Sequence, residues 1–312
     1  MRRPALLLSL LLLFAASVAG AQTPSRPDTL SGVQTPFRPD TLSGTQGTSP
    51  ADTVDTQDEW SAVDPGRYAG LDSLLRQFYA ALEHDAVETK NAEFDALIAS
   101  CRDSLLRQHV TFRVFDHYRY SRIMGEEAVA IHVYDEWIAS GKVKLRNEME
   151  EMDAQLFSDF NRSSLLGMQA PKVSLRKPGC GKMTVPVAGR ITVMFFYDTS
   201  CAKCRLEASV LPTVLKEVDF PMDFVAVYVG ADKAEWRAFR RNFRIANRKI
   251  KLRHLWDPEM ESDYQRLYGV IGTPKVFLVW KDGEILGRRL EVDSLMEMIK
   301  YVKISENVEA KK

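Results

Sequence analysis

The stretch Ile191-Thr-Val-Met-Phe-Phe-Tyr-Asp-Thr-Ser-Cys-Ala-Lys-Cys204 decides the fold. Its first seven residues, 191–197, form an unbroken apolar run, which is typical of a central strand covered on both faces. A helical pattern follows over residues 202–218, so Cys201 and Cys204 lie where a strand gives way to a helix. This junction predicts an α/β domain that carries a pair of cysteines at the start of a helix.

Strand and helix patterns alternate through the rest of the C-terminal part. Strands are predicted at 224–229, 252–256, 275–280 and 284–288, and helices at 232–245, 259–268 and 292–302. Lys281-Asp282-Gly283 joins the last two strands and is a typical hairpin turn. We therefore predict an α/β fold, a mixed sheet flanked by helices, over residues 166–305, with a tail at 306–312.

The spacing of Cys201 and Cys204 suits redox chemistry. A thiolate at a helix N-terminus is stabilised by unpaired backbone N–H groups, which lowers cysteine pKa values from about 8.5 to roughly 3.5–7.5. We expect Lys203 and Arg205 to add favourable positive charge. Cys201 is then the expected nucleophile toward a substrate disulfide, and Cys204 the residue that resolves the mixed disulfide.

A zinc half-site and a structural disulfide are the alternatives for this pair. Zinc in proteins usually takes four Cys or His ligands, and the five histidines of the chain show no ligand spacing relative to the cysteines. We therefore expect no metal and no cofactor.

Ile271-Gly-Thr-Pro274, directly before a predicted strand, is the second informative motif. With the Cys-x-x-Cys pair it makes the chain resemble the thioredoxin superfamily, specifically the exported TlpA/ResA-like thiol–disulfide oxidoreductases. In that superfamily a cis-proline preceded by Thr or Val faces the two cysteines. The resemblance implies these roles for Pro274 and Thr273, a thioredoxin-like fold, and thiol–disulfide oxidoreductase activity.

Two further motifs carry the resemblance, Leu166-Gly-Met-Gln-Ala-Pro171 and Cys204-Arg-Leu-Glu207. It implies that Glu207 handles the proton of the resolving thiol; a solvated glutamate favoured by the helix dipole is an equal alternative. Two features depart from the family, since Ser200 stands where Trp is frequent and Ala-Lys replaces central dipeptides such as Gly-Pro. Central residues tune the reduction potential, so the direction of electron flow stays open.

Residues 66–165 have helical periodicity, and we predict an all-α helical domain there. Helices are expected at about 71–82, 94–105, 110–124, 126–139 and 144–160. Tyr120-Ser-Arg-Ile-Met-Gly-Glu-Glu127 resembles the helical domain that precedes thioredoxin-like domains in many Bacteroidetes proteins. Cys101 is expected to be a buried, inert thiol and Cys180 to be exposed in a hairpin turn, both outside the site.

The N-terminal 65 residues predict export. Arg2 and Arg3 precede an apolar run at 5–18 and a small-residue end, which together indicate a signal peptide over residues 1–21, with no lipoprotein cysteine. Residues 22–65 contain a repeat, at 22–32 and 34–44, whose composition indicates a disordered linker. Its Asp-Thr-Leu triplets resemble an O-glycosylation sequon, a second interpretation. We expect a periplasmic protein.

The balance of charged residues bears on the kind of partner that the protein binds. Lys plus Arg equals Asp plus Glu, which argues against nucleic acid as a partner. The leading expectation is an exported enzyme that reduces or exchanges protein disulfides, and the resemblance implies a membrane-bound or soluble redox partner. Two alternatives remain: a thioredoxin-fold binding or scaffold module whose helical domain recruits a partner, and a peroxiredoxin-type peroxidase. The latter class has Thr three residues before its reactive cysteine, where Asp198 stands here.

Overall fold

The computed structural model describes residues 68–309, with side chains through residue 305. The expected signal peptide (1–21) and linker (22–65) lie outside the described residues. The chain divides into two compact units. One includes helix α3 (Ala69–Leu82) and residues Ala99–Asp103, and the other includes Ala86–Ile98 and everything from Ser104 onward.

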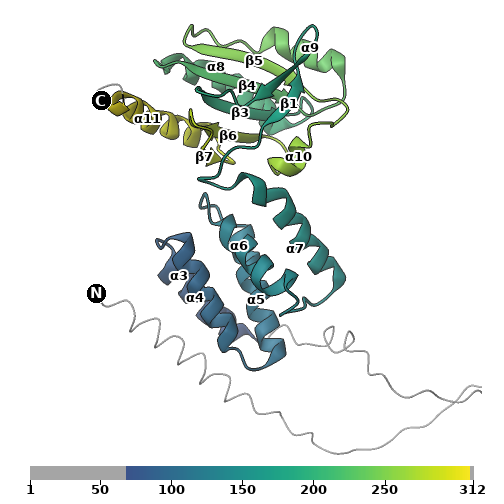
Figure 1. Ribbon diagram of the computed structural model, residues 1–312, viewed down its shortest axis with the longest axis vertical. Helices are drawn as coiled ribbons and strands as arrows, with labels where there is room; N and C mark the ends of the chain where they lie inside the picture. Colours follow the sequence, from purple (N-terminus) through teal and green to yellow (C-terminus); the bar gives the residue numbers. More distant parts are fainter. Residues whose placement is uncertain (1–67, 310–312) are drawn as a thin grey trace, which may run out of the picture. The chain divides into compact units, whose positions relative to one another are not determined.

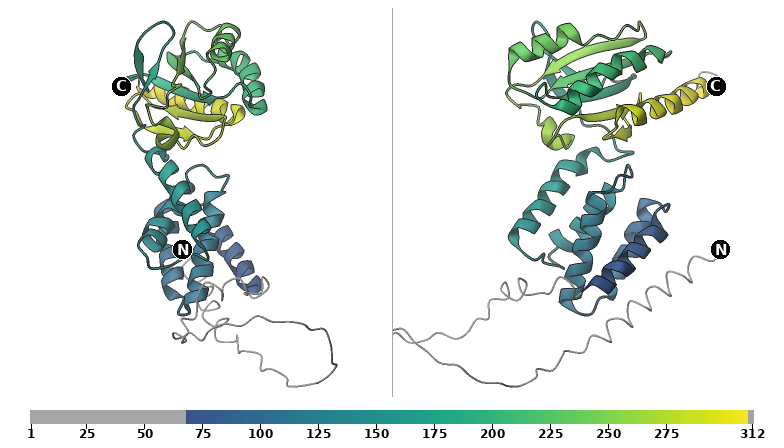
Figure 2. Two further views of the ribbon diagram at one scale, coloured as in Figure 1. Left: turned by 90° about the vertical axis from the view of Figure 1, so that its right-hand side faces the viewer. Right: turned by 180° about the vertical axis from the view of Figure 1, so that it is seen from behind.

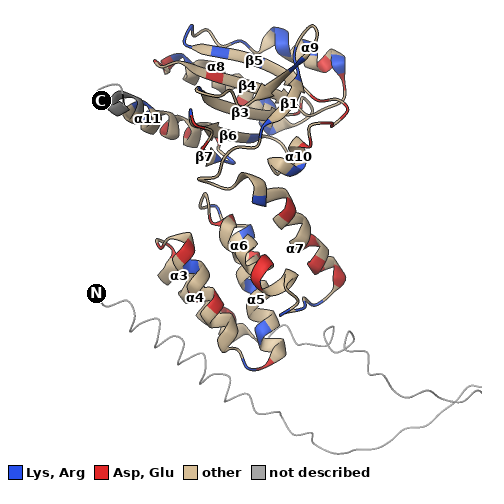
Figure 3. Ribbon diagram, viewed as in Figure 1, with Lys and Arg blue, Asp and Glu red and all other residues tan. Residues whose placement is uncertain are grey.

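The region upstream of the sheet is helical, as predicted. Its further elements are α4 (Val87–Ser100), α5 (Ser104–Arg119), α6 (Glu127–Val133), the π-helical turn η1 (Tyr134–Ala139), α7 (Glu148–Asn161) and the 3-10 turn η2 (Arg162–Ser164). The Asn147 side chain accepts a hydrogen bond from Glu150 N, which starts α7 later than predicted. The first turn of α7 is acidic (Figure 3).

Two helix predictions in this region are wrong. The helix expected over 94–105 is two helices, because α4 ends at Ser100 and Leu105 belongs to α5; Cys101 lies between them and is buried. The apolar spacing continues across the break, so periodicity could not reveal it. Helix α5 ends at Arg119 rather than at 124, which leaves residues 120–126 as a loop between α5 and α6.

The remaining chain forms a seven-stranded mixed sheet (Figure 1). Its strands, in spatial order, are β2 (Lys182–Val185), β1 (Val173–Arg176), β5 (Ile250–Trp256), β4 (Met222–Tyr228), β3 (Ile191–Tyr197), β6 (Lys275–Val279) and β7 (Ile285–Arg288). Strands β3, β4 and β5 run parallel, whereas β6 and β7 are antiparallel additions on one side and β1 and β2 on the other. The predicted mixed sheet is confirmed.

Strand β3 is buried along its whole length because both faces of the sheet are covered. Val193 and Phe195 belong to one core cluster, together with residues of α8 (Ala202–Val214), α9 (Lys233–Asn242) and α11 (Val292–Glu309). Met194 and Phe196 face the other cluster, which includes Tyr264 of α10 (Tyr264–Leu267). Helices α8 and α11 contact each other (Figure 2). Successive side chains of β3 therefore contribute to two hydrophobic cores, one on each face of the sheet.

Two helices near the C-terminus differ in length from prediction. Helix α10 is shorter than the expected 259–268 because Met260 and Asp263 have left-handed backbone angles (φ 52° and 54°) that a helix cannot include. Helix α11 continues to Glu309, past the expected domain end at residue 305. Between residues 68 and 309, no helix is long and apolar enough to cross a membrane.

His254 on β5 is a buried base whose protonation should weaken the fold. Its ring packs edge-on against Phe239 and Phe243 and is 7% exposed. Burial, with the charges of Arg240 and Arg244, lowers the pKa of His254 to about 4. In the unfolded chain it titrates near 6.5, so between pH 6.5 and 4 the unfolded state binds the extra proton.

The unfolding free energy should therefore fall by about 3 kcal/mol across this window through His254 alone. In His254→Leu the loss of stability between pH 7 and pH 4.5, measured by urea unfolding, should be smaller than in the wild type by about 2 kcal/mol or more. His84→Leu, at an exposed position, is the matched control and should lose as much stability between pH 7 and pH 4.5 as the wild type. An equal loss in wild type and His254→Leu would show that His254 is protonated in the folded protein.

Candidate active site

Cys201 occupies the N-cap position of α8. Its backbone is extended (φ −71°, ψ 117°), and its sulfur accepts a hydrogen bond from Cys204 N at 3.1 Å. The same sulfur lies 3.4 Å from the carbonyl oxygen of Thr273, to which the thiol donates. The Thr273–Pro274 peptide bond is cis. Cys201 and Thr273, 72 positions apart in sequence, thus meet because β3 and β6 are neighbours in the sheet.

The two sulfurs have different environments. Cys204 is 2% exposed, and burial, followed by its hydrogen bond to Cys201, raises the pKa of its thiol to about 12. Burial also disfavours ionisation of half-buried Cys201, but the hydrogen bonds from the Cys204 thiol and from the backbone N–H groups at the helix start lower its pKa overall. Both are free thiols. Cys201 is therefore the thiol that ionises first.

The two cations expected to help the thiolate also bind other groups. Lys203 Nζ is 2.6 Å from Glu291 Oε1, so its charge is paired. Arg205 Nη1 donates to the carbonyls of Thr199 and Ser200, at 2.9 Å each. Hydrogen bonds, rather than these two cations, are the main cause of the lowered pKa of Cys201. Lys203 lies within electrostatic range of Cys201, as predicted, whereas Arg205 binds the loop carbonyls and is not among the main causes of the lowered pKa of Cys201.

The loop before Cys201 is held from within. Asp198 Oδ1 accepts hydrogen bonds from the backbone N and the hydroxyl of Ser200, at 2.7 and 2.5 Å. With the Arg205 contacts, this fixes the three residues that join β3 to the reactive cysteine. These hydrogen bonds hold Cys201 at the start of α8, so its sulfur is in position before a substrate binds.

Glu207 lies one turn beyond Cys204 on α8 and is 6% exposed. Burial raises the pKa of its carboxyl; the charge of Lys203 opposes this and that of Glu291 adds to it. Among the described residues its Oε2 atom has no hydrogen-bond partner. Within the described part of the chain, no hydrogen bond joins the Glu207 carboxyl to the sulfur of Cys201 or Cys204. Glu207 is therefore a buried carboxyl on the helix that carries the pair.

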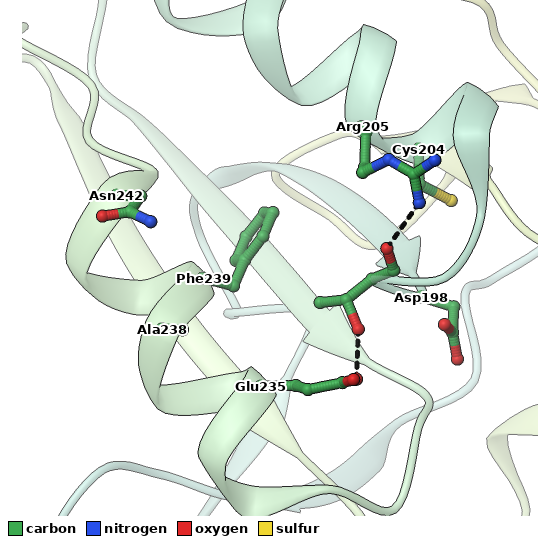
Figure 4. Close-up of a pocket in the computed structure, with 8 residues that line it drawn as sticks. Asp198, Cys204, Arg205, Glu235, Ala238, Phe239 and Asn242 are labelled. Carbon is green, nitrogen blue, oxygen red and sulfur yellow. Dashed lines mark hydrogen bonds between the residues drawn. The ribbon is translucent and has the colours of Figure 1, made fainter.

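A cavity of about 270 Å³ opens beside α8 and α9. Figure 4 shows its lining residues, which are Asp198, Thr199, Cys204, Arg205, Glu235, Ala238, Phe239 and Asn242. Glu235 accepts hydrogen bonds from the hydroxyls of Thr199 and of Tyr228, the latter at 2.8 Å. The α9 residues could not be predicted from the sequence, because the parallel pairing of β3 with β4 brings them here and no local motif marks them.

Cys180 is an exposed free thiol in the turn between β1 and β2, as expected. In residues 68–309, no group of three or more His, Cys, Asp or Glu side chains is arranged to hold a metal ion.

Comparisons with known proteins agree with this architecture. Residues 189–285 match a family model described as thioredoxin-like. A crystal structure of a thioredoxin-like protein from Bacteroides caccae is similar, with 14% identity and a TM-score of 0.58, covering 82% of this chain and 98% of that one. No curated protein matches.

Two other solved structures resemble the C-terminal part. The thioredoxin domain of a thiol-disulfide oxidoreductase from Bacteroides vulgatus shares 18% identity, with a TM-score of 0.38, and the match covers 45% of this chain and 99% of that one. StoA from Bacillus subtilis shares 16% identity, with a TM-score of 0.34, covering 41% and 96%. The sheet and the family match together identify this part of the chain as a thioredoxin-like domain.

Proposed function

We propose that the protein is an exported thiol–disulfide oxidoreductase that reduces or exchanges disulfides of periplasmic proteins through Cys201 and Cys204. The observation that carries the proposal is the position of Cys201 Sγ, 3.1 Å from Cys204 N at a helix start and beside the Thr273 carbonyl. The charged and apolar N-terminus supports export. N-terminal sequencing of the periplasmic protein checks this, with Gln22 expected as the first residue.

The proposed cycle has two exchange steps. The Cys201 thiolate attacks one sulfur of a substrate disulfide, forming a mixed disulfide and releasing the other substrate sulfur as a thiolate that takes a proton. Cys204 then loses its proton and attacks Cys201 Sγ, which releases the second substrate thiol. The substrate gains two electrons and two protons, and the protein is left with a Cys201–Cys204 disulfide. A dithiol donor restores the reduced pair.

The second step needs a base, because Cys204 is buried and burial raises the pKa of its thiol. Glu207 is our candidate, since it lies one turn away on the same helix and its carboxyl has a raised pKa, which brings it closer to that of a useful proton acceptor. We propose that it takes the Cys204 proton through local rearrangement or through water. The Thr273 backbone, next to the reactive sulfur, is the proposed contact for an incoming substrate strand.

Turnover in an insulin reduction assay, with dithiothreitol as the donor, tests the proposal. Wild-type protein should accelerate the reaction, and Cys201→Ser should return it to the uncatalysed rate because no thiolate remains to attack. Cys204→Ser should also lose turnover, since the mixed disulfide is no longer resolved from within. Cys180→Ser, which removes an exposed thiol outside the pair, is the matched control and should keep full activity. Full activity in Cys201→Ser would refute the proposal.

A further inference from the structure

The loop between α5 and α6, residues 120–126, is anchored to the thioredoxin-like part by a buried ion pair. Arg288 of β7 is 1% exposed, and its Nη1 lies 3.0 Å from Glu127 Oε1. Gly125 N donates to the other Glu127 oxygen at 3.1 Å, and Arg288 Nη2 donates to Asn161 Oδ1 at 2.8 Å. The end of the loop is therefore fixed to strand β7.

The rest of the loop is also held in one conformation. Ile123 N donates to Ser121 Oγ at 3.0 Å, and Ser121 Oγ donates to Glu126, whose carboxylate pairs with buried Lys90. Met124 Sδ accepts from Arg288 N at 3.3 Å. Met124 packs against the same core cluster as Cys201. A loop held at this many points presents its exposed side chains without an ordering cost on binding.

The side chains that this loop presents are Arg122 and Ile123, the latter 44% exposed. Arg122 is connected to the reactive pair through one shared neighbour, Glu291. Its carboxylate binds Lys203, two residues after Cys201, and the pKa of Glu291 is lowered first by Lys203 and further by the charge of Arg122. Lys203 in turn lies within electrostatic range of Cys201.

The charges on this face do not balance. Glu291 is already paired with Lys203, whereas Arg122 has no ion-pair partner among the described residues. Arg289, two residues before Glu291, lies 3.9 Å from Glu127, whose carboxylate is already paired with buried Arg288. Two apolar side chains are exposed in these segments: Ile123 follows Arg122, and Ile271 lies two residues before Thr273.

We propose that Arg122 and Ile123 form part of the substrate docking surface and select polypeptides whose reactive cysteine is flanked by acidic and apolar residues. The helical region then contributes specificity to the thioredoxin-like domain. Opposite charges raise the association rate and lower the dissociation rate of a docked chain, while the apolar side chains bury surface against it. This inference rests on the proposed function.

Two nonapeptides test it, each with one cysteine held as a mixed disulfide with thionitrobenzoate. Both keep leucine next to the cysteine, and they differ only in flanking Glu or Lys. Release of thionitrobenzoate by an excess of the reduced full-length protein gives a second-order rate constant for each peptide. The wild type should prefer the Glu peptide by about tenfold at low ionic strength, and 0.5 M salt should remove most of the preference.

Arg122→Glu should bring the Glu-to-Lys ratio to one or below, and Arg122→Gln should lie between. Because both rates come from the same sample, the ratio does not depend on the folded fraction. Arg237→Glu, an exposed position on α9, is the control with the same charge change and should keep the wild-type ratio.

Two results would overturn the inference. The inference is wrong if Arg122→Glu keeps the wild-type ratio, or if the wild type reacts with the two peptides at equal rates. In either case the proposed function still holds, provided that the wild type reduces uncharged hydroxyethyl disulfide. No reaction of the wild type with hydroxyethyl disulfide overturns the proposed function, and the inference with it.

Discussion

Iodoacetamide at pH 7 should alkylate Cys201 at least about a thousand times faster than Cys204. With a pKa of about 12, Cys204 is a thiolate in about one molecule in 10⁵ at this pH, and it is 2% exposed. Cys201 is half-buried with a pKa below its ordinary value of 9.0, so at least about 1% of it is thiolate. Time-resolved alkylation followed by peptide mapping measures both rates.

The same experiment between pH 5 and 9 tests the cause of the difference. The rate at Cys201 should rise to its plateau at a lower pH in the folded protein than in the urea-unfolded chain, because the helix-start hydrogen bonds exist only in the fold. First modification at Cys204, or one titration curve for folded and unfolded Cys201, would contradict this account of the site.

Arg288→Ala should lower the unfolding free energy by about 3–5 kcal/mol. The substitution leaves Glu127, 1% exposed, without its closest cation and removes the hydrogen bond to Asn161. An uncompensated buried charge costs this much because no water replaces the lost partner. Urea unfolding monitored by circular dichroism measures the change.

Two further variants identify the charge as the cause. Arg288→Met with Glu127→Leu replaces the pair by apolar side chains and should recover most of the loss, since buried pairs often contribute little net stability themselves. Lys300→Ala breaks the exposed pair with Glu297 and should change the unfolding free energy by no more than about 0.5 kcal/mol. A loss below 1 kcal/mol in Arg288→Ala would mean that Glu127 finds another partner.

Local sequence predicted the centre of the fold well. The bounds of β3, 191–197, follow directly from an apolar run whose ends are marked by polar residues. Thr273 lies beside Cys201, as the family resemblance, rather than local sequence, predicted. The strand bounds and the helix start at Cys201 came from the stretch itself. These features were readable because each depends on a few consecutive residues.

Features that depend on distant residues were not readable. The Arg288–Glu127 pair joins positions 161 residues apart, and nothing in either neighbourhood indicates the other. The partners of Lys203 and Arg205 depend on where Glu291 and the 198–200 loop lie in space. Helix breaks, such as the one after Ser100, interrupt the helical conformation of the backbone while the apolar spacing of the sequence continues.

Trapping of the mixed disulfide tests the central claim most directly. Reduced Cys204→Ser protein is mixed with an oxidised protein substrate, quenched with acid, and the linked peptides are identified by mass spectrometry. The account predicts a substrate cysteine joined to Cys201, and no such adduct in Cys201→Ser, because only Cys201 combines access with a lowered pKa. An adduct through Cys204 in Cys201→Ser, with none through Cys201 in the reciprocal variant, would contradict it.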